Sequence, residues 1–545
     1  MSLEAAYSQL LSDLQRVSLP LWMPELVLIL LIVALLLARL LGWQRMLTAS
    51  RLMLFGSAIS AAIATQQFSQ WLATATPHAA PLQLFSGLLL FDGFALFIRV
   101  LLLVILLLAG YMAAAAEILE PEDLTEFYVL LLGSTLGLLL MPAANHLLVL
   151  FLALEMTSVP SYILAGFMRG RRHAGEAALK YIVYGGGAAG ILLYGISLLA
   201  GLTGTVQLNE WPERLHQLGS DPGFWTDGTA RTLLLAWIMV VCGLAFKLSL
   251  VPFQFWCPDV FEGATTEVAA YLSVGSKTGA LAMLVRICLA CGPAERLGPE
   301  VSQLLAWLGV GLGLLAILTT TFGNLGAYPQ TNLKRLLAYS TIGQAGFLLM
   351  PLAALLLIRY GGGPEQIATP EVRLAAATRA LACILYYLIA YFCMKFGAFA
   401  VVAAVRNRLL SQDLGDWRGI ARQSPGVCVC LAICMFSLVG LPPLAGFFAK
   451  LLVFASLYEA TPFHPSMWLV LIAGLVNTVV SLFYYLRVLR AAFFETRTSV
   501  AKVVEIPLSS NIGRLILLLT VPTVVMGIGV EPVLQLARRV AEAVL

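Results

Sequence analysis

The chain alternates between long apolar runs and short polar connections over nearly its whole length. A run of about 20 apolar residues is long enough to cross ~30 Å of hydrocarbon as a helix. The pattern predicts about fourteen such helices, near residues 23–42, 52–72, 92–114, 127–143, 145–167, 178–201, 232–256, 265–292, 302–323, 334–358, 376–404, 426–455, 467–490 and 512–530. The longest polar connection, 206–231, is read as a loop.

Composition supports the same fold class. Of the 545 residues, 60% are hydrophobic and only 11% are charged, whereas soluble domains carry about 25% charged residues. We therefore expect an all-α polytopic membrane protein in contact with lipids. The net charge of +4 comes from basic residues in loops, so it does not indicate nucleic-acid binding.

The basic residues are unevenly divided between alternate loops, which predicts orientation. The richer set consists of Arg45, Arg51, the "RGRR" stretch 169–172, the "NLKR" stretch 332–335, Arg406, Arg408, Arg418, Arg422, Arg490, Arg497 and Lys502. The sparser set consists of Arg214, Arg231, Arg296, Arg359 and Arg373. We expect the richer set to face the cytoplasm, with both termini on the lumenal or periplasmic side.

Prolines interrupt two runs at corresponding positions. Pro252 breaks the seventh run in "SLVPF", and Pro442 and Pro443 break the twelfth in "VGLPPLAGF". Paired breaks five spans apart suggest a five-helix unit, spans 4–8, that recurs inverted as spans 9–13. The predicted divisions are 1–126 (three helices), 127–292 and 302–490 (the two repeats), and 491–545 (a loop and the last helix). Two unrelated kinks are the alternative.

Ionisable residues lie inside several runs, where a charge costs at least ~2.5–3.5 kcal/mol and marks a functional site by default. They are Glu155, Lys180, Lys247, Lys277, Lys395 and Lys450. We expect Glu155 to pair with Lys247, and the break at Pro252 to expose hydrated backbone beside that lysine. Such groups suit a proton relay. The alternatives are snorkelling by Lys180 and Lys450, and a static ion pair.

No cofactor or metal site is predicted on this chain. "CLAC" at 288–291 has CxxC spacing, but it lacks a second pair or nearby histidines, so its cysteines are read as packing residues.

Three long motifs carry a resemblance to a known family. They are "GLAFKLSLVPFQFWCPDVFEGATTEVAAYLSVGSK" (243–277), "NLKRLLAYSTIGQAGF" (332–347) and "LVGLPPLAGFFAKL" (438–451). They resemble the antiporter-like membrane subunits of respiratory complex I, and among these the N subunit of bacterial NADH–quinone oxidoreductase and its cyanobacterial and plastid counterpart, subunit 2. The similarity covers about 127–490. The cyanobacterial form is the closer one, which implies plastoquinone and a thylakoid membrane; a bacterial inner or plasma membrane is the alternative.

The resemblance implies that Glu155, Lys247, Lys277 and Lys450 match the family's proton-translocation residues, with Lys180 as a further member and Lys395 as a departure. It also implies partners in a membrane arm and a peripheral arm. Iron–sulfur clusters, NAD(P)H or ferredoxin, and quinone would be bound there, and this chain would have no redox chemistry of its own. The expected path enters near Lys277, passes Lys247 under control of Glu155, and leaves through Lys395 and Lys450.

Two other functions fit the same residues. One is a stand-alone or Mrp-type cation/proton antiporter, which would use the same relay. The other is a structural spacer whose charges only hold helices together.

Overall fold

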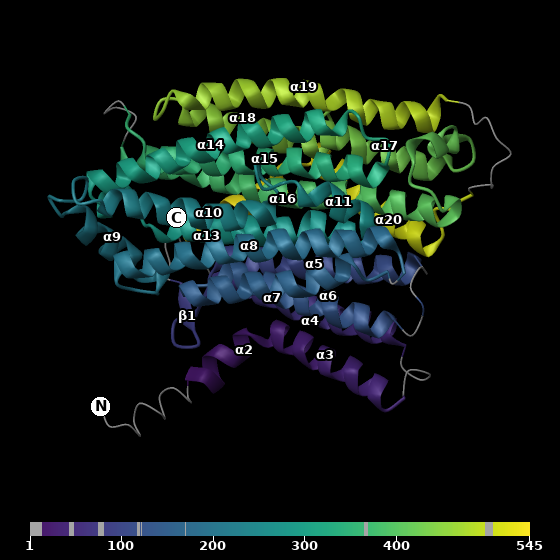
Figure 1. Ribbon diagram of the computed structural model, residues 1–545, viewed down its shortest axis with the longest axis horizontal. Helices are drawn as coiled ribbons and strands as arrows, with labels where there is room; N and C mark the ends of the chain where they lie inside the picture. The colour runs from purple at the N-terminus through teal and green to yellow at the C-terminus, as the bar shows by residue number, and fades with distance from the viewer. Residues whose placement is uncertain are drawn as a thin grey trace.

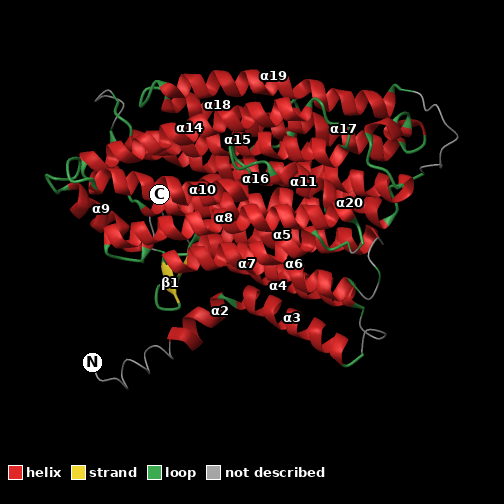
Figure 2. Ribbon diagram, in the orientation of Figure 1, coloured by secondary structure: helices red, strands yellow, loops and turns green. Residues whose placement is uncertain are grey.

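The structure is a computed structural model that describes residues 13–42, 48–74, 81–116, 120, 123–168, 170–363, 369–495 and 505–545. Four basic residues of the orientation argument lie outside these ranges, namely Arg45, Arg169, Arg497 and Lys502. Nearly all of the described chain is helical (Figure 2). The helices run side by side, with α3 (Met23–Leu40) along one edge of the molecule and α19 (Ser466–Phe493) along the opposite edge (Figure 1).

The elements follow one another with short connections. The first part contains η1 (Leu14–Ser18), α2 (Leu19–Leu21), α3, α4 (Ala49–Thr74), β1 (Leu82–Leu84), β2 (Leu89–Phe91) and α5 (Gly93–Ala116). The middle part contains α6 (Leu124–Ala143), α7 (Leu147–Ala165), α8 (Arg172–Thr203), η3 (Leu208–Glu210), α9 (Trp211–Gly219), α10 (Thr229–Leu248), α11 (Trp256–Gly263), α12 (Thr266–Tyr271), η4 (Leu272–Ser276) and α13 (Lys277–Ala290). The last part contains η5 (Ala294–Arg296), α14 (Pro299–Ala327), α15 (Leu333–Tyr360), α16 (Pro370–Leu409), η6 (Leu414–Trp417), η7 (Ile420–Arg422), α17 (Pro425–Val439), α18 (Ala445–Ala460), α19, α20 (Asn511–Ile528) and α21 (Glu531–Val544).

The predicted all-α membrane fold is confirmed. Twelve helical segments in the described chain are long and apolar enough to cross a membrane, or thirteen if the bent pair Leu414–Arg422 and α17 counts as one. Two of the fourteen predicted spans are not among the twelve. The second corresponds to α4, which contains glutamines, and the twelfth is divided between the short helices α17 and α18.

The connection 206–231, which the sequence indicated as a loop, contains the short helix α9, and two further features were not predicted. β1 and β2 form a small antiparallel hairpin in which Leu82 is opposite Phe91, and α21 follows the last span and packs against α16. The hairpin lies near Ser18 and near the last residue, Leu545. The Phe85 N–H donates to the Ser18 hydroxyl at 3.0 Å, and Leu545 lines a cavity of about 540 Å³ with residues of the hairpin.

The centre of the bundle is formed by α15, α16 and the span α12–η4–α13, which are buried along almost their whole length. Helices that are apolar on all sides are expected in such a position. Small residues bring α14 and α15 together: a side chain on Gly323 would meet the Gly343 backbone nitrogen at 2.4 Å. Such close approach is typical of membrane helices, and it places polar groups of α15 next to those of neighbouring spans.

Candidate functional site

The seventh span is broken where the prolines predicted. α10 ends at Leu248, Ser249 follows in a left-handed conformation with φ 58°, and α11 begins only at Trp256. The carboxyl end of a helix leaves carbonyls without partners and carries partial negative charge. Lys277, at the end of the π-helical turn η4, donates to the Lys247 carbonyl at 2.8 Å and to the Ser249 hydroxyl at 2.5 Å. An ammonium group therefore closes this break.

Lys247 and Glu155 do not form the direct ion pair that we expected. The fully buried Lys247 ammonium donates to the Ser158 hydroxyl at 3.0 Å, three residues beyond Glu155 on α7. Glu155 is only half-buried, because its stretch of α7 also carries the exposed side chains of Leu152 and Met156. Its Oε1 atom is buried and has no hydrogen-bond partner. The two groups interact electrostatically, with Ser158 adjacent to the lysine.

Lys450 closes the second break in the same way. α17 ends at Val439, Gly440 follows with φ 92°, and the Lys450 ammonium donates to the Val439 carbonyl at 2.9 Å. It lies 4.3 Å from the centre of the Phe347 ring and is only 3% exposed. The side chain points into the protein, so snorkelling does not describe it. Each broken span thus has a lysine bound to the carboxyl end of its first half-helix.

Lys395 lies between the two breaks, fully buried in α16. Its ammonium donates to the Leu337 carbonyl and the Ser340 hydroxyl, both at 2.8 Å. Ser340 is hydrogen-bonded to Tyr485, and Tyr485 in turn interacts with Gln344. These contacts lead away from Lys395 toward the twelfth span.

The remaining gaps in this line are filled by polar groups. Gln344 donates to the Leu438 carbonyl at 3.0 Å, next to the Val439 carbonyl that Lys450 binds. On the other side, the buried Cys257 thiol lies near both Lys277 and Lys395. The order in space is therefore Glu155, Lys247, Lys277, Lys395 and Lys450. We call these five residues the buried line.

This order differs from the expected path in one respect. We expected Lys277 to precede Lys247, but the Lys247 side chain lies on the Glu155 side of Lys277. Lys277 is the neighbour of the Lys395 region, through Cys257. The η4 turn explains the difference, because it places Lys277 against the end of α10 rather than beyond it.

Lys180 is not in the buried line. It forms ion pairs with Glu176 at 2.7 Å and Asp259 at 2.6 Å, and its side chain is 38% exposed. Asp259 also pairs with Arg335 at 2.7 Å. This cluster borders a cavity of about 240 Å³ that is also lined by Gln254, a buried residue of the seventh-span break whose Oε1 has no partner.

Sequence reasoning missed several buried ionisable residues. Arg286 forms a two-bond ion pair with Asp92, at 2.6 and 2.8 Å, and Arg99 pairs with Glu25 at 2.9 Å. All four lie within or at the start of apolar runs. Their opposite charges at these positions could have predicted two buried ion pairs. Lys334 was read as a loop residue, but it is buried and donates to the carbonyls of Glu262 and Ala264 at the end of α11.

The cysteines of "CLAC", Cys288 and Cys291, are buried free thiols. The described residues contain no group of three or more metal-ligating side chains.

The fold and the site together define a class of polytopic membrane protein. Two of its helices are broken, and buried ionisable groups extend from one break through Lys395 to the other. The sequence matches the family described as "NADH:quinone oxidoreductase/Mrp antiporter, TM" at residues 144–358 and 371–481, and the chain belongs to this family. The predicted family resemblance is confirmed.

Named relatives agree with this assignment. The chain is 38% identical over 418 residues to NADH-quinone oxidoreductase subunit N of Anaeromyxobacter sp. (strain Fw109-5), covering 76% of each chain. It is 35% identical to NADH-quinone oxidoreductase subunit N 2 of Sorangium cellulosum (strain So ce56), covering 85% of this chain and 86% of the relative. In the solved structure of respiratory complex I from Thermus thermophilus with bound aureothin, one chain matches with a TM-score of 0.70 and 29% identity, covering 94% of this chain and 98% of that one.

Proposed function

We propose that this chain is a proton-translocating membrane-arm subunit of a complex I-type quinone oxidoreductase. One observation carries the proposal: the four lysines of the buried line lie in succession between the two helix breaks, and each is hydrogen-bonded to neutral carbonyls or hydroxyls. A lysine paired directly with a carboxylate is held in its charged form, whereas an amine bound to neutral acceptors in a low-dielectric interior can exchange its proton. The named relatives support the assignment to such a complex.

The route that we propose uses the part of the buried line from Lys277 to Lys450. Protons approach from the side of the basic loops through the cavity beside Lys180, Asp259 and Arg335, where Gln254 would bind water at the break. They reach Lys277. Its charge repels that of Lys247, which in turn is attracted by Glu155. They continue through Lys395 and leave past Lys450. Pairwise electrostatic coupling makes the charge on one group bias the next.

The redox chemistry belongs to other subunits in this proposal. Iron–sulfur clusters, the electron donor (NADH, NADPH or ferredoxin) and quinone would bind elsewhere in the complex, and this chain would supply the translocase step. Its basic loops would face the cytoplasm and its termini the opposite side. Plastoquinone and a thylakoid location stay predictions from the sequence motifs. The inverted repeats at 127–292 and 302–490 likewise stay a prediction.

The test is to replace Lys395 by methionine in the intact complex. The complex is purified through a tag on this chain, reconstituted in liposomes, and assayed for quinone reduction and for proton uptake with a pH-sensitive dye. We expect quinone reduction to continue with fewer protons moved per electron. Absence of quinone-reducing activity from the purified wild-type complex would contradict the assembly. A normal proton ratio in the fully assembled Lys395→Met complex would contradict the relay.

The Mrp-type antiporter remains the second candidate, because the family description includes it. It predicts that the purified chain alone exchanges sodium for protons across a liposome membrane. The complex I assignment predicts no such exchange without the other subunits. A sodium gradient that drives proton movement through the isolated chain would therefore favour the antiporter.

A further inference from the structure

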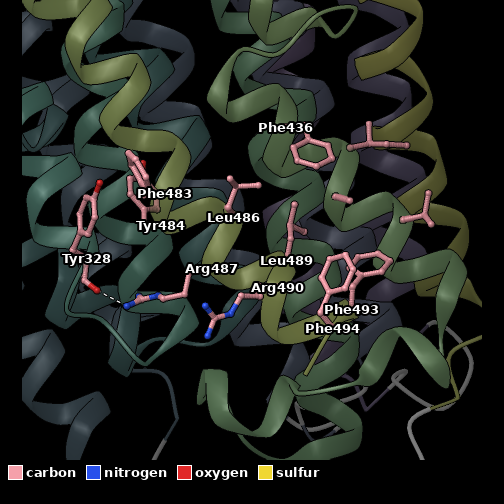
Figure 3. A pocket seen from close by; sticks show the side chains of 13 residues that line it. Tyr328, Phe436, Phe483, Tyr484, Leu486, Arg487, Leu489, Arg490, Phe493 and Phe494 are labelled. Carbon is pink, nitrogen blue, oxygen red and sulfur yellow. Dashed lines mark hydrogen bonds between the residues drawn. The ribbon is translucent and has the colours of Figure 1, made fainter. Parts of the chain in front are cut away.

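A groove on the membrane-facing surface near one edge of the molecule is separate from the buried line. It has a volume of about 820 Å³ and lies between α17 and α19, with Tyr328 at one end (Figure 3). Its walls are apolar and include Val429, Ile433, Phe436, Phe483, Leu486 and Phe493. A volume of this size lies within the range of ~300–1,000 Å³ that is usual for small-ligand sites.

The exposure of the groove shows which surroundings it meets. Phe483 is 60% exposed and Val429 is 49% exposed, although both lie in helices that cross or half-cross the membrane. Ten residues separate Phe483 from Phe493, so the groove follows α19 for about 15 Å at 1.5 Å per residue. Arg490 lies within this stretch, and the part between Phe483 and Arg490 is about 10 Å long. Part of an acyl chain lying along α19 would fit there.

Two arginines, Arg487 and Arg490, line the groove on the last two turns of α19 (Figure 3). Arg490 is 73% exposed in its side chain, and only its Nε is bound, to Glu495 at 3.1 Å. Arg418 pairs with the same carboxylate at 2.9 Å. Arg487 is held by backbone carbonyls of Tyr328 and Gln330, while its buried Nε has no partner. Two guanidinium groups, those of Arg418 and Arg490, therefore share the Glu495 carboxylate.

Exposed positive charge beside an apolar groove favours one kind of occupant. Guanidinium groups bind phosphate through paired N–H donors, and basic residues at a membrane surface attract anionic lipids. We propose that this groove is a binding site for an anionic phospholipid, with its headgroup phosphate at Arg490 and one acyl chain between α17 and α19. A zwitterionic lipid offers the same chains, but its headgroup carries no net negative charge.

The test measures lipid retained by the full complex after detergent purification and exchange into equal amounts of phosphatidylglycerol and phosphatidylcholine. Native mass spectrometry then counts the lipid bound to this chain. We expect the wild type to retain phosphatidylglycerol preferentially, and Arg490→Gln to lower that retention at least fivefold. Ala432→Phe, which fills the groove without changing charge, should lower the retention of both lipids. Arg514→Gln is the matched control, because Arg514 is an exposed arginine at the start of the next span, away from the groove lining.

Three outcomes would overturn the proposal. The first is equal retention of the two lipids by the wild type. The second is retention that neither Arg490→Gln nor Ala432→Phe changes. The third is a map of the intact complex in which a helix of a neighbouring subunit fills the groove. None of these outcomes depends on proton transfer, so the lipid site can fail while the proposed function stands.

Discussion

Replacing Lys277 by arginine and by methionine separates a proton carrier from a static structural charge. The Lys277 ammonium satisfies the Lys247 carbonyl at 2.8 Å and the Ser249 hydroxyl at 2.5 Å. Arginine keeps a permanent charge and several N–H donors, but it does not release a proton in proteins. Methionine removes both the charge and the donors. A structural role would thus be preserved by arginine, whereas a relay role would be lost in both variants.

The magnitudes can be worked from these contacts. Lys277→Met leaves two buried acceptors without their donor, which lowers the folding stability by ~1–3 kcal/mol each. The variant also avoids burying an ammonium group, which offsets this loss by several kcal/mol. Lys277→Arg adds volume to a site that is 1% exposed, at ~1–3 kcal/mol. The ordinary pKa values of arginine and lysine differ by at least ~2 units, so deprotonated arginine is at least ~100-fold rarer. We expect both variants to assemble and both to move fewer protons per electron.

The assay compares proton uptake with quinone reduction in proteoliposomes, and native gels report assembly. Lys334→Met is the control for loss of a buried lysine that caps a helix, since Lys334 binds carbonyls at the end of α11 and lies outside the buried line. It should keep the wild-type proton ratio. A Lys277→Arg complex that pumps at the wild-type ratio would refute the reasoning, because the proton of that lysine would then not be transferred.

Three further predictions test the rest of the site and the fold. Gln254→Leu removes the amide that borders the cavity at the break, so proton uptake should slow in the reconstituted complex while quinone reduction by detergent-solubilised complex is unchanged; equal uptake rates would argue against this route. Gly323→Ala should destabilise the protein by ~1–3 kcal/mol, seen as a lower unfolding temperature, whereas Gly311→Ala on the same helix meets nothing within 4 Å and should not. Arg286→Met leaves Asp92 buried without its partner and should cost ~3–5 kcal/mol, seen as reduced assembly that Asp92→Asn partly restores; normal stability of the single variant would contradict the structural role of the pair.

Much of the architecture could be predicted from run lengths and prolines. The two breaks occur where Pro252 and Pro442–Pro443 indicated, and the ionisable residues inside the apolar runs include all five members of the buried line. These features depend on local sequence: a proline removes a backbone donor wherever it stands, and a charge in an apolar run is costly in any tertiary arrangement.

The partners of these charges could not be predicted, because they are backbone carbonyls and serine hydroxyls. Lys277 binds the carbonyl of Lys247, and Lys450 binds that of Val439. A carbonyl is present at every residue, so side-chain identities do not show which one will be free. Opposite charge favours an ion pair between Glu155 and Lys247, whereas nothing in the sequence indicates that the lysine binds the Ser158 hydroxyl. Helix rotation and the η4 turn, which set these contacts, depend on tertiary packing.

Lys277 and Lys450, which bind the carbonyls at the two helix breaks, link their own protonation to the rigidity of each break. A charged donor binds a carbonyl about twice as strongly as a neutral one. Each helix break should therefore be held more firmly when its lysine is protonated than when the lysine is neutral. Because such linkage is reciprocal, bending either helix break from outside would alter how readily its amine takes up or gives away a hydrogen ion. A neighbour that pushes on α10 or α18 could thereby drive this chain without contributing any group to its interior.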